Sequence, residues 1–232
     1  MAAEASAKDR TGWFKRTQWD KHLQAYLDWK LLAYAVWPPG NDEPALRQVV
    51  LAVEEVVEQA VRGLSTLLIE TLRWLRSAKL NEPDVRPLGQ MQNKSSQQRA
   101  ARLWARLLCY CVRLIAAEEA DEAVETEEEE QQPPRQQKKP PLQALVGIAH
   151  LFPWHSRQKQ AARRLWGIVS RKKGEESAAT VQEVRKYVLR LSQELICQDV
   201  CHQPFESGLI HFLAALGINP DTLRLRTAPE FS

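Results

Sequence analysis

Glycine is scarce in this sequence, with nine residues in a chain of 232. Enzymes built on phosphate-binding loops and β-sandwiches need many tight turns, so this content argues against both classes. Long apolar runs are also missing, because no stretch approaches the roughly 18 consecutive apolar residues of a membrane span. The first ten residues lack the apolar core of a secretory signal. We therefore expect an intracellular protein with no membrane segment.

Familiar catalytic and cofactor-binding motifs are missing as well. The sequence contains no Gly-x-Gly-x-x-Gly fingerprint, no Gly-Lys-Ser/Thr phosphate loop, no Gly-x-Ser-x-Gly elbow and no His-Glu-x-x-His pair. The five histidines are scattered, and none has a carboxylate or a nucleophile at a recognisable spacing. We predict that the chain is not an enzyme and that it holds no cofactor.

The chain as a whole lacks an excess of one charge, since 32 Lys and Arg face 29 Asp and Glu and leave a formal charge of +3. This balance excludes a histone-like polycation. It hides a local separation, because residues 118–130 hold nine acids, whereas residues 131–174 hold ten Lys and Arg and no acid. Without residues 118–130 the formal charge of the remaining chain is +12.

Cysteine occurs four times, and without a signal segment we expect the thiols to be reduced. Cys197 and Cys201 lie one helical turn apart and are followed by His202 and His211, a set that could supply four zinc ligands. The spacing matches no common zinc template, and the two cysteines lie in an apolar helical pattern. Buried cysteines on a helix face are the alternative interpretation, and we predict no metal site.

Helical periodicity is what the sequence does contain. Between residues 44 and 75, apolar side chains recur every 3.6 residues, which predicts a long amphipathic helix that breaks, if anywhere, near Gly63. Pro44 suits the first turn of this helix, with Asn41 or Asp42 as its cap. The same period recurs in residues 100–115, 161–169, 181–196 and 205–216. In the helix that begins at residue 95 or 96, we place four arginines on the exposed side: Arg99, Arg102, Arg106 and Arg113.

These patterns predict an all-α fold, an irregular helical bundle in two parts joined by an acidic and Pro-rich disordered linker. Residues 1–10 are expected to be disordered and residues 11–117 to form the N-terminal helical part. Residues 118–141 form the predicted linker, residues 142–217 the C-terminal helical part and residues 218–232 an irregular tail. We allow one exception, since the preceding helix could continue into the first acids of the linker.

The acid-free segment also contains tryptophan, because Trp154 and Trp166 are interleaved with its basic residues. Basic residues with aromatic neighbours are typical of contacts with a nucleic-acid backbone. Two other interpretations stay open: the basic residues pair with the preceding acids of the same chain, or they form an ordinary solvated helix face. The candidate residues for nucleic-acid binding are Arg157, Lys159, Arg163, Arg164, Arg171, Lys172 and Lys173.

Four segments resemble a known family: RTGWFKRTQWDKHLQAYLDWKLLAYAV, SQQRAARLWARLLCYCVR, LFPWHSRQKQAARRLWG and PFESGLIHFLAALGINPDTLRLRTAPEFS. They are similar to the middle region of a multi-copy family of large filamentous-fungal proteins. Members of that family carry a zinc-finger-like segment near the N-terminus, and some continue into a RecQ-type, telomere-linked helicase domain. This chain has no paired-cysteine finger before Thr11 and no helicase motifs. The resemblance implies a nuclear protein and a truncated copy of a larger nucleic-acid-associated protein.

The sequence therefore predicts a non-enzymatic helical interaction module. The alternative is a stand-alone nucleic-acid binder that uses the basic helix within residues 157–173. Candidate partners are DNA or RNA, and another protein that would cover an exposed apolar surface on the last helix, from Leu209 to Leu216.

Overall fold

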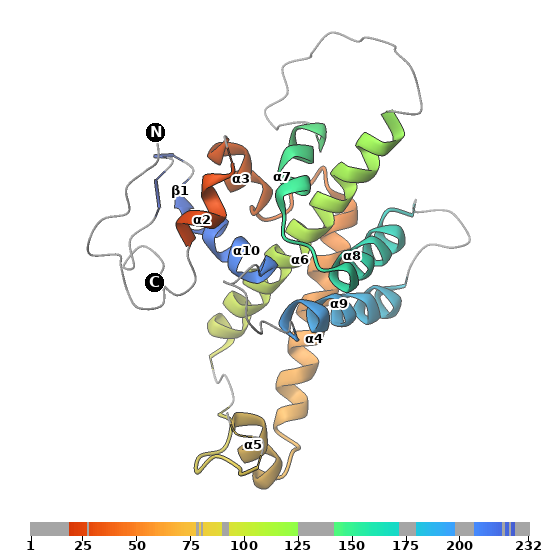
Figure 1. The fold of residues 1–232 in the computed structure, drawn as a ribbon. Helices are drawn as coiled ribbons and strands as arrows, with labels where there is room; N and C mark the ends of the chain where they lie inside the picture. Colours follow the sequence, from red (N-terminus) through yellow and green to blue (C-terminus); the bar gives the residue numbers. More distant parts are fainter. Residues whose placement is uncertain are drawn as a thin grey trace.

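The computed structural model describes residues 19–26, 28–77, 79, 81–89, 93–124, 142–171, 180–197, 207–219, 221–222 and 224–225. The fold is all-α, as predicted (Figure 1). The α-helices are α2 (Trp19–Gln24), α3 (Trp29–Ala35), α4 (Pro44–Leu64), α5 (Ile69–Arg76), α6 (Lys94–Val124), α7 (Val146–Leu151), α8 (Ser156–Val169), α9 (Val181–Ile196) and α10 (Gly208–Leu216). A 3₁₀ turn (Leu142–Leu145) precedes α7. Among the described residues, none of these helices is both long and apolar enough to cross a membrane.

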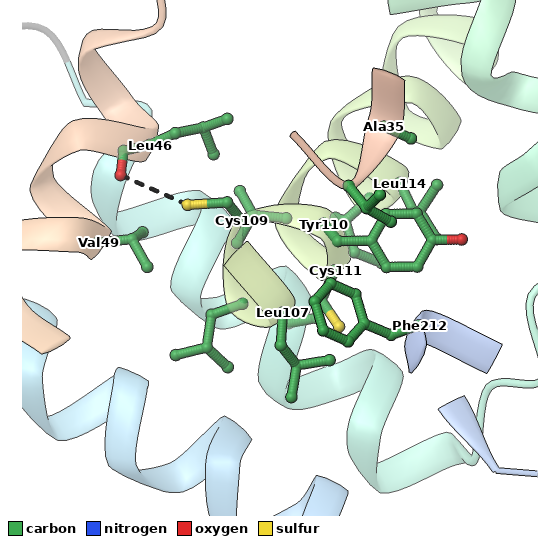
Figure 2. Close-up of a cluster of buried hydrophobic side chains, with 14 of the residues drawn as sticks. Ala35, Leu46, Val49, Leu107, Cys109, Tyr110, Cys111, Leu114 and Phe212 are labelled. Atoms are coloured by element: carbon green, nitrogen blue, oxygen red, sulfur yellow. Dashed lines mark hydrogen bonds between the residues drawn. The ribbon is translucent and has the colours of Figure 1, made fainter. Parts of the chain in front are cut away.

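Helix α6 is the central element of the fold. It contacts α4, α7, α8, α9 and α10, and residues 107–118 are buried on every side of the helix. Such all-round burial explains why the segment LLCYCVRLIAA has no polar stripe. Figure 2 shows Tyr110 beside Phe212 of α10, and the thiol of Cys109 directed at the carbonyl oxygen of Leu46 in α4. The Sγ–O distance of this contact is 3.7 Å.

The two helical parts predicted from the sequence share one core, which extends from Leu23 in α2 to Ile218 after α10. Helix α4 packs against α8 and α9, and α6 packs against α8. The residue at which the linker was expected to begin, Glu118, lies inside α6, which continues to Val124. The remainder of the predicted linker, residues 125–141, lies outside the described residues, as do residues 1–10.

Helix α4 follows its predicted apolar stripe through Leu46, Val49, Val53 and Val56, all of which are buried. It ends at Leu64 instead of continuing to residue 75, so the expected break near Gly63 is confirmed. Two hydroxyl groups bond to carbonyls of the last turn of α4: Ser65 Oγ donates to the carbonyl of Arg62, and Thr66 Oγ1 donates to that of Gly63. At the start of α4, Pro44 is the first helical residue and the cap is Glu43, not Asn41 or Asp42.

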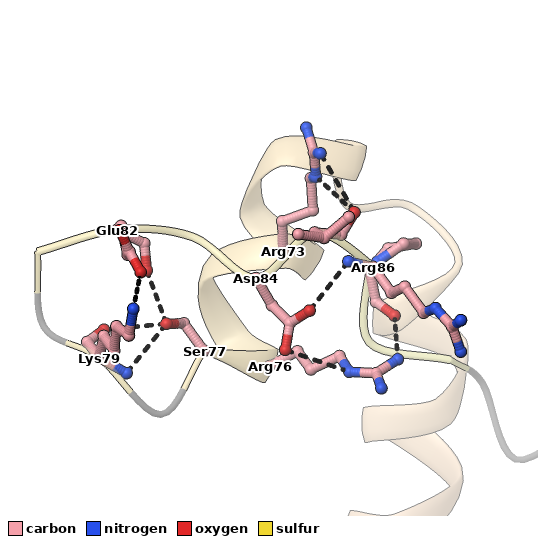
Figure 3. A network of polar contacts seen from close by, with 9 residues as sticks. Arg73, Arg76, Ser77, Lys79, Glu82, Asp84 and Arg86 are labelled. Carbon is pink, nitrogen blue, oxygen red and sulfur yellow. Dashed lines mark hydrogen bonds and ion pairs between the residues drawn. The ribbon is translucent and has the colours of Figure 1, made fainter.

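The segment after α4 forms a separate projection, which we call the α5 arm (residues 65–77, 79 and 81–89). Figure 1 shows α5 at the far end of α4, away from the other helices. Polar contacts hold the arm together: Arg73 Nη2 donates to the carbonyl of Val85 over 3.1 Å, and the amide of Leu88 donates to the carbonyl of Leu72 over 2.9 Å. Figure 3 shows Arg76 beside Asp84 in this network. The Nε–Oδ2 distance of this ion pair is 3.5 Å.

The segment after α10, predicted to be irregular, contains a short antiparallel strand pair. Strand β1 (Ile218–Asn219) pairs with β2 (Arg224–Leu225), with Ile218 opposite Leu225. The side chain of Asn219 accepts a hydrogen bond from the amide of Asp221 over 2.9 Å and so stabilises the turn. The prediction missed this pair because two-residue strands carry no detectable period.

Candidate nucleic-acid interface

The predicted basic helix is α8, and its buried side fixes its orientation. Ala161, Ala162, Leu165 and Val169 are buried, as the sequence pattern indicates. Gln158 is also buried; its side-chain NH₂ donates to the carbonyl of Glu194 over 3.1 Å and links α8 to α9. The charged side chains of α8 therefore emerge on two borders, one toward the end of α6 and one toward α9.

The border toward α6 is neutralised within the chain. Lys159 Nζ lies 2.8 Å from Glu118 Oε2, and Arg163 Nη2 lies 3.3 Å from Glu122 Oε1. The Glu118 side chain is only 5% exposed and also lies 3.7 Å from Arg163. Two of the predicted binding residues, Lys159 and Arg163, thus pair with the acids of the same chain, which was one of the alternatives left open.

The two tryptophans are engaged in packing. Trp166 is half-buried, and its indole N–H donates to Glu119 Oε2 over 2.7 Å. Trp154 is half-buried against Phe152, with ring centroids 4.4 Å apart. Both indoles contribute to the fold between α6, α7 and α8, so the expectation that they accompany the basic residues at a binding surface is not supported.

The border toward α9 carries the unneutralised charge. Arg157 and Arg164 are exposed, lie seven residues apart on one face of α8 and have no partner among the described residues. Together with Gln160 and with Arg190 and Glu194 of α9, they line a cavity of about 390 Å³. Arg190 Nη2 lies 2.6 Å from Glu194 Oε1. We call Arg157, Arg164 and Arg190 the α8–α9 arginine cluster.

The other predicted binding residues contribute less. Arg171 follows the end of α8, is exposed, and lines a different cavity beside α4. Lys172 and Lys173 lie outside the described residues. The sequence analysis missed Arg190, because it lies on another helix. The only feature of the sequence that points to an exposed position for Arg190 is Glu194 four residues later, a spacing typical of ion pairs on an exposed helix face.

The four candidate zinc ligands are not brought together in the described part of the chain. Cys197 caps the end of α9 and is exposed, whereas Cys201 and His202 lie outside the described residues. His211 is 1% exposed, and its Nε2 lies 2.9 Å from the hydroxyl oxygen of Tyr110. Burial, with a smaller contribution from His22, lowers the pKa of His211 to about 3. No group of three or more potential metal ligands occurs among the described residues.

The other two thiols, Cys109 and Cys111, are fully buried in α6. Burial raises the pKa of Cys109 to about 12 and raises that of Cys111 further above its usual range. A thiol must ionise to act as a nucleophile or metal ligand, so these two side chains serve as small apolar groups in the core.

The proposed apolar surface on the last helix is not exposed. In α10, Ile210, Phe212, Ala214 and Ala215 are buried, and Leu209, Leu213 and Leu216 are half-buried against the core. Helices α2 and α3, together with α6 and α9, cover α10. The prediction of an exposed apolar surface at residues 209–216 is therefore wrong.

Comparisons with protein-family models, with curated proteins and with solved structures found no match.

Proposed function

We propose that the chain is a non-enzymatic helical interaction module that binds the phosphate backbone of a nucleic acid through the α8–α9 arginine cluster. The observation that carries this proposal is the pair Arg157 and Arg164, which are exposed on one face and have no partner among the described residues. The neighbouring cations Lys159 and Arg163 already form ion pairs with acids of the same chain.

The chemistry of the cluster suits phosphate. A guanidinium group presents a planar fork of donors that matches two phosphate oxygens. The cavity lining is mainly polar and holds three arginines against one glutamate, Glu194. The resemblance to a fungal family points in the same direction, because some of its members continue into a helicase domain; a nuclear location is part of the proposal.

We expect the Arg157→Gln/Arg164→Gln variant to bind labelled DNA or RNA more weakly than the unmodified chain. Each phosphate contact releases counterions, so losing two contacts should reduce the slope of log K against log[salt] by about 2. Fluorescence anisotropy with a single strand and with a duplex, at several salt concentrations, measures both quantities. The matched control is Lys94→Gln/Arg99→Gln, which removes the same charge from an exposed part of α6.

Binding that falls equally in the control would indicate a general charge effect and would contradict a site at the cluster. A chain that binds neither DNA nor RNA at low salt would overturn the proposal. The Arg163→Gln variant adds a second check, because a side chain already paired with Glu118 and Glu122 should contribute little to binding.

A second candidate function is docking to another protein through the α5 arm. Helix α5 has no buried residue, although its sequence is amphipathic. Large apolar side chains are exposed along the arm: Leu67, Leu68, Ile69, Trp74, Leu75 and Val85. The polar network of Arg73 and Arg76 holds the backbone in place, so these side chains are presented without a large ordering cost on binding.

We expect the apolar dye ANS to bind the unmodified chain and to lose most of its fluorescence with the Leu68→Ser/Leu75→Ser variant. Exposed apolar patches bind such dyes, and both of these side chains are more than half exposed. The matched control is Leu189→Ser/Ile196→Ser, which removes two exposed apolar side chains from α9. Equal dye fluorescence from the arm variant and the unmodified chain would contradict an accessible patch on the arm.

A further inference from the structure

Two surface cavities lie along α4, one beside the proline turn and α6 and the other beside the end of α8. These two cavities, of about 530 and 540 Å³, share Arg47 and Leu51 and therefore adjoin. Among the residues that α4 contributes, Arg47, Leu51 and Glu54 recur at helical spacing and form a stripe distinct from the buried one. We call this feature the α4 groove.

The inner surface of the α4 groove is apolar. The apolar part of the first cavity's lining comes from three places: the turn after α3 (Pro38 and Pro39), α4 (Val50 and Leu51) and α6 (Ala105). Leu51 is 56% exposed, although it lies between the buried residues Val49 and Val53 of the same helix. The turn itself is held firmly, because Arg106 Nε donates to the carbonyl of Val36 over 2.8 Å.

The charges around the groove are mainly positive. Its lining includes Arg47, Arg102, Arg106 and Arg171 against a single acid, Glu54. Arg102 is exposed and has no partner within the described ranges. The side chain of Arg47 makes a long hydrogen bond, 3.5 Å from its Nη1 to Asn41 Oδ1. An apolar surface with guanidinium groups around it suits a ligand that carries both carboxylates and apolar side chains.

This composition separates the α4 groove from the α8–α9 arginine cluster. The cluster cavity is mainly polar, whereas prolines, valine, leucine and alanine line the first cavity of the groove. A phosphate backbone has no apolar part to fill such a surface, but an amphipathic peptide does. The two cavities share Arg47 and Leu51, so a peptide that lies over these two side chains contacts both cavities.

We propose that the α4 groove binds an acidic, amphipathic peptide segment of a partner protein. Apolar side chains of the peptide lie on Leu51, Pro38 and Ala105, and its carboxylates pair with Arg47 and Arg102. This site is independent of the proposed nucleic-acid contact, because no residue of the α8–α9 arginine cluster lines the groove.

The test uses a labelled helical peptide with leucines on one face and glutamates on the other, measured by fluorescence anisotropy with the full chain. We expect binding with a Kd on the order of 1–100 μM, and a loss of about tenfold or more with Arg102→Glu and with Leu51→Ser. Arg99→Glu is the matched control for Arg102→Glu, since Arg99 is also an exposed arginine of α6 but does not line the groove. Circular dichroism confirms that each variant is folded.

Three further measurements separate the outcomes. A peptide with lysines in place of the glutamates should not bind, and Arg157→Gln/Arg164→Gln should leave binding of the acidic peptide unchanged, even if the nucleic-acid proposal fails. A single-stranded oligonucleotide that displaces the peptide and loses affinity with Arg102→Glu would show that the groove is a nucleic-acid surface and would overturn the proposal. No binding of the acidic peptide, or equal binding by the Arg99→Glu and Arg102→Glu variants, would overturn it as well.

Discussion

The Arg113→Met variant is expected to lose about 2–4 kcal/mol of the free energy of unfolding, because it leaves the half-buried carboxylate of Glu43 without its cation and two backbone carbonyls without their donor. The Arg113 side chain is 2% exposed and makes a two-pronged ion pair with Glu43, with Nε–Oε1 and Nη2–Oε2 distances of 2.8 and 2.9 Å. Its Nη1 donates to the carbonyls of Ala35 and Trp37, each over 2.7 Å. One side chain thus fixes the end of α3, the proline turn and the start of α4 on α6.

Chemical denaturation at neutral pH measures this loss. Arg102→Met is the matched control, since it removes an exposed arginine from the same helix and should change the stability by less than about 0.5 kcal/mol. Glu43→Gln and the double variant complete a cycle that isolates the energy of the pair. A loss below about 1 kcal/mol for Arg113→Met would mean that water replaces the guanidinium group at little cost.

Arg113 also marks where the sequence analysis failed. Helical spacing placed it on the exposed side of its helix with Arg99, Arg102 and Arg106, and only Arg99 and Arg102 are exposed. The pattern cannot detect the reason, which is that the last carbonyls of α3 have no helical partners and need donors from elsewhere. That need arises only when α3 and α6 are packed together, so it is a property of the tertiary structure.

The helices that carry a clear period were predictable, and their ends were less so. The buried stripes of α4, α8 and α9 match the sequence pattern at Val49, Leu165 and Val188, because burial on one face is what the period records. The extension of α6 through Glu118 to Val124 was only an allowed exception. Alanine and glutamate favour a helix there, and contacts of Glu118 and Glu122 with α8 stabilise it further.

The candidate site was predictable as a helix but not as a surface. Arg157, Lys159, Arg163 and Arg164 are equivalent in the sequence, and the packing of α6 against α8 divides them into paired and unpaired side chains. The burial of α10 could not be predicted either, because it also depends on how distant helices pack together. Helices α2 and α3, which supply much of its cover, lie almost the whole chain length away in sequence.

His211 should make the stability of the fold depend on pH in a range where most carboxylates stay ionised. Its ring lies among Tyr26, Tyr110 and Phe152, with centroids 5.0, 6.1 and 5.3 Å away, and burial lowers its pKa from the usual 6.5 to about 3. Below pH 6.5 the unfolded chain therefore binds a proton that the folded chain does not. We expect the free energy of unfolding to fall by up to about 1.4 kcal/mol per pH unit as the pH drops from about 6 to 5, where the carboxylates are still ionised.

Denaturation curves between pH 7.5 and 5 test this expectation, because few carboxylates are protonated in that range. The His211→Gln variant has no ring to titrate, so its free energy of unfolding should be nearly independent of pH over this range. We expect it to be less stable at neutral pH but still folded, since the amide can still bond to the Tyr110 hydroxyl. His150→Gln is the matched control, because His150 is exposed beside Asp121 and its loss should leave the slope intact. An unchanged slope in His211→Gln would assign the pH dependence to another group, of which the half-buried His22, 6.0 Å from His211, is the nearest histidine.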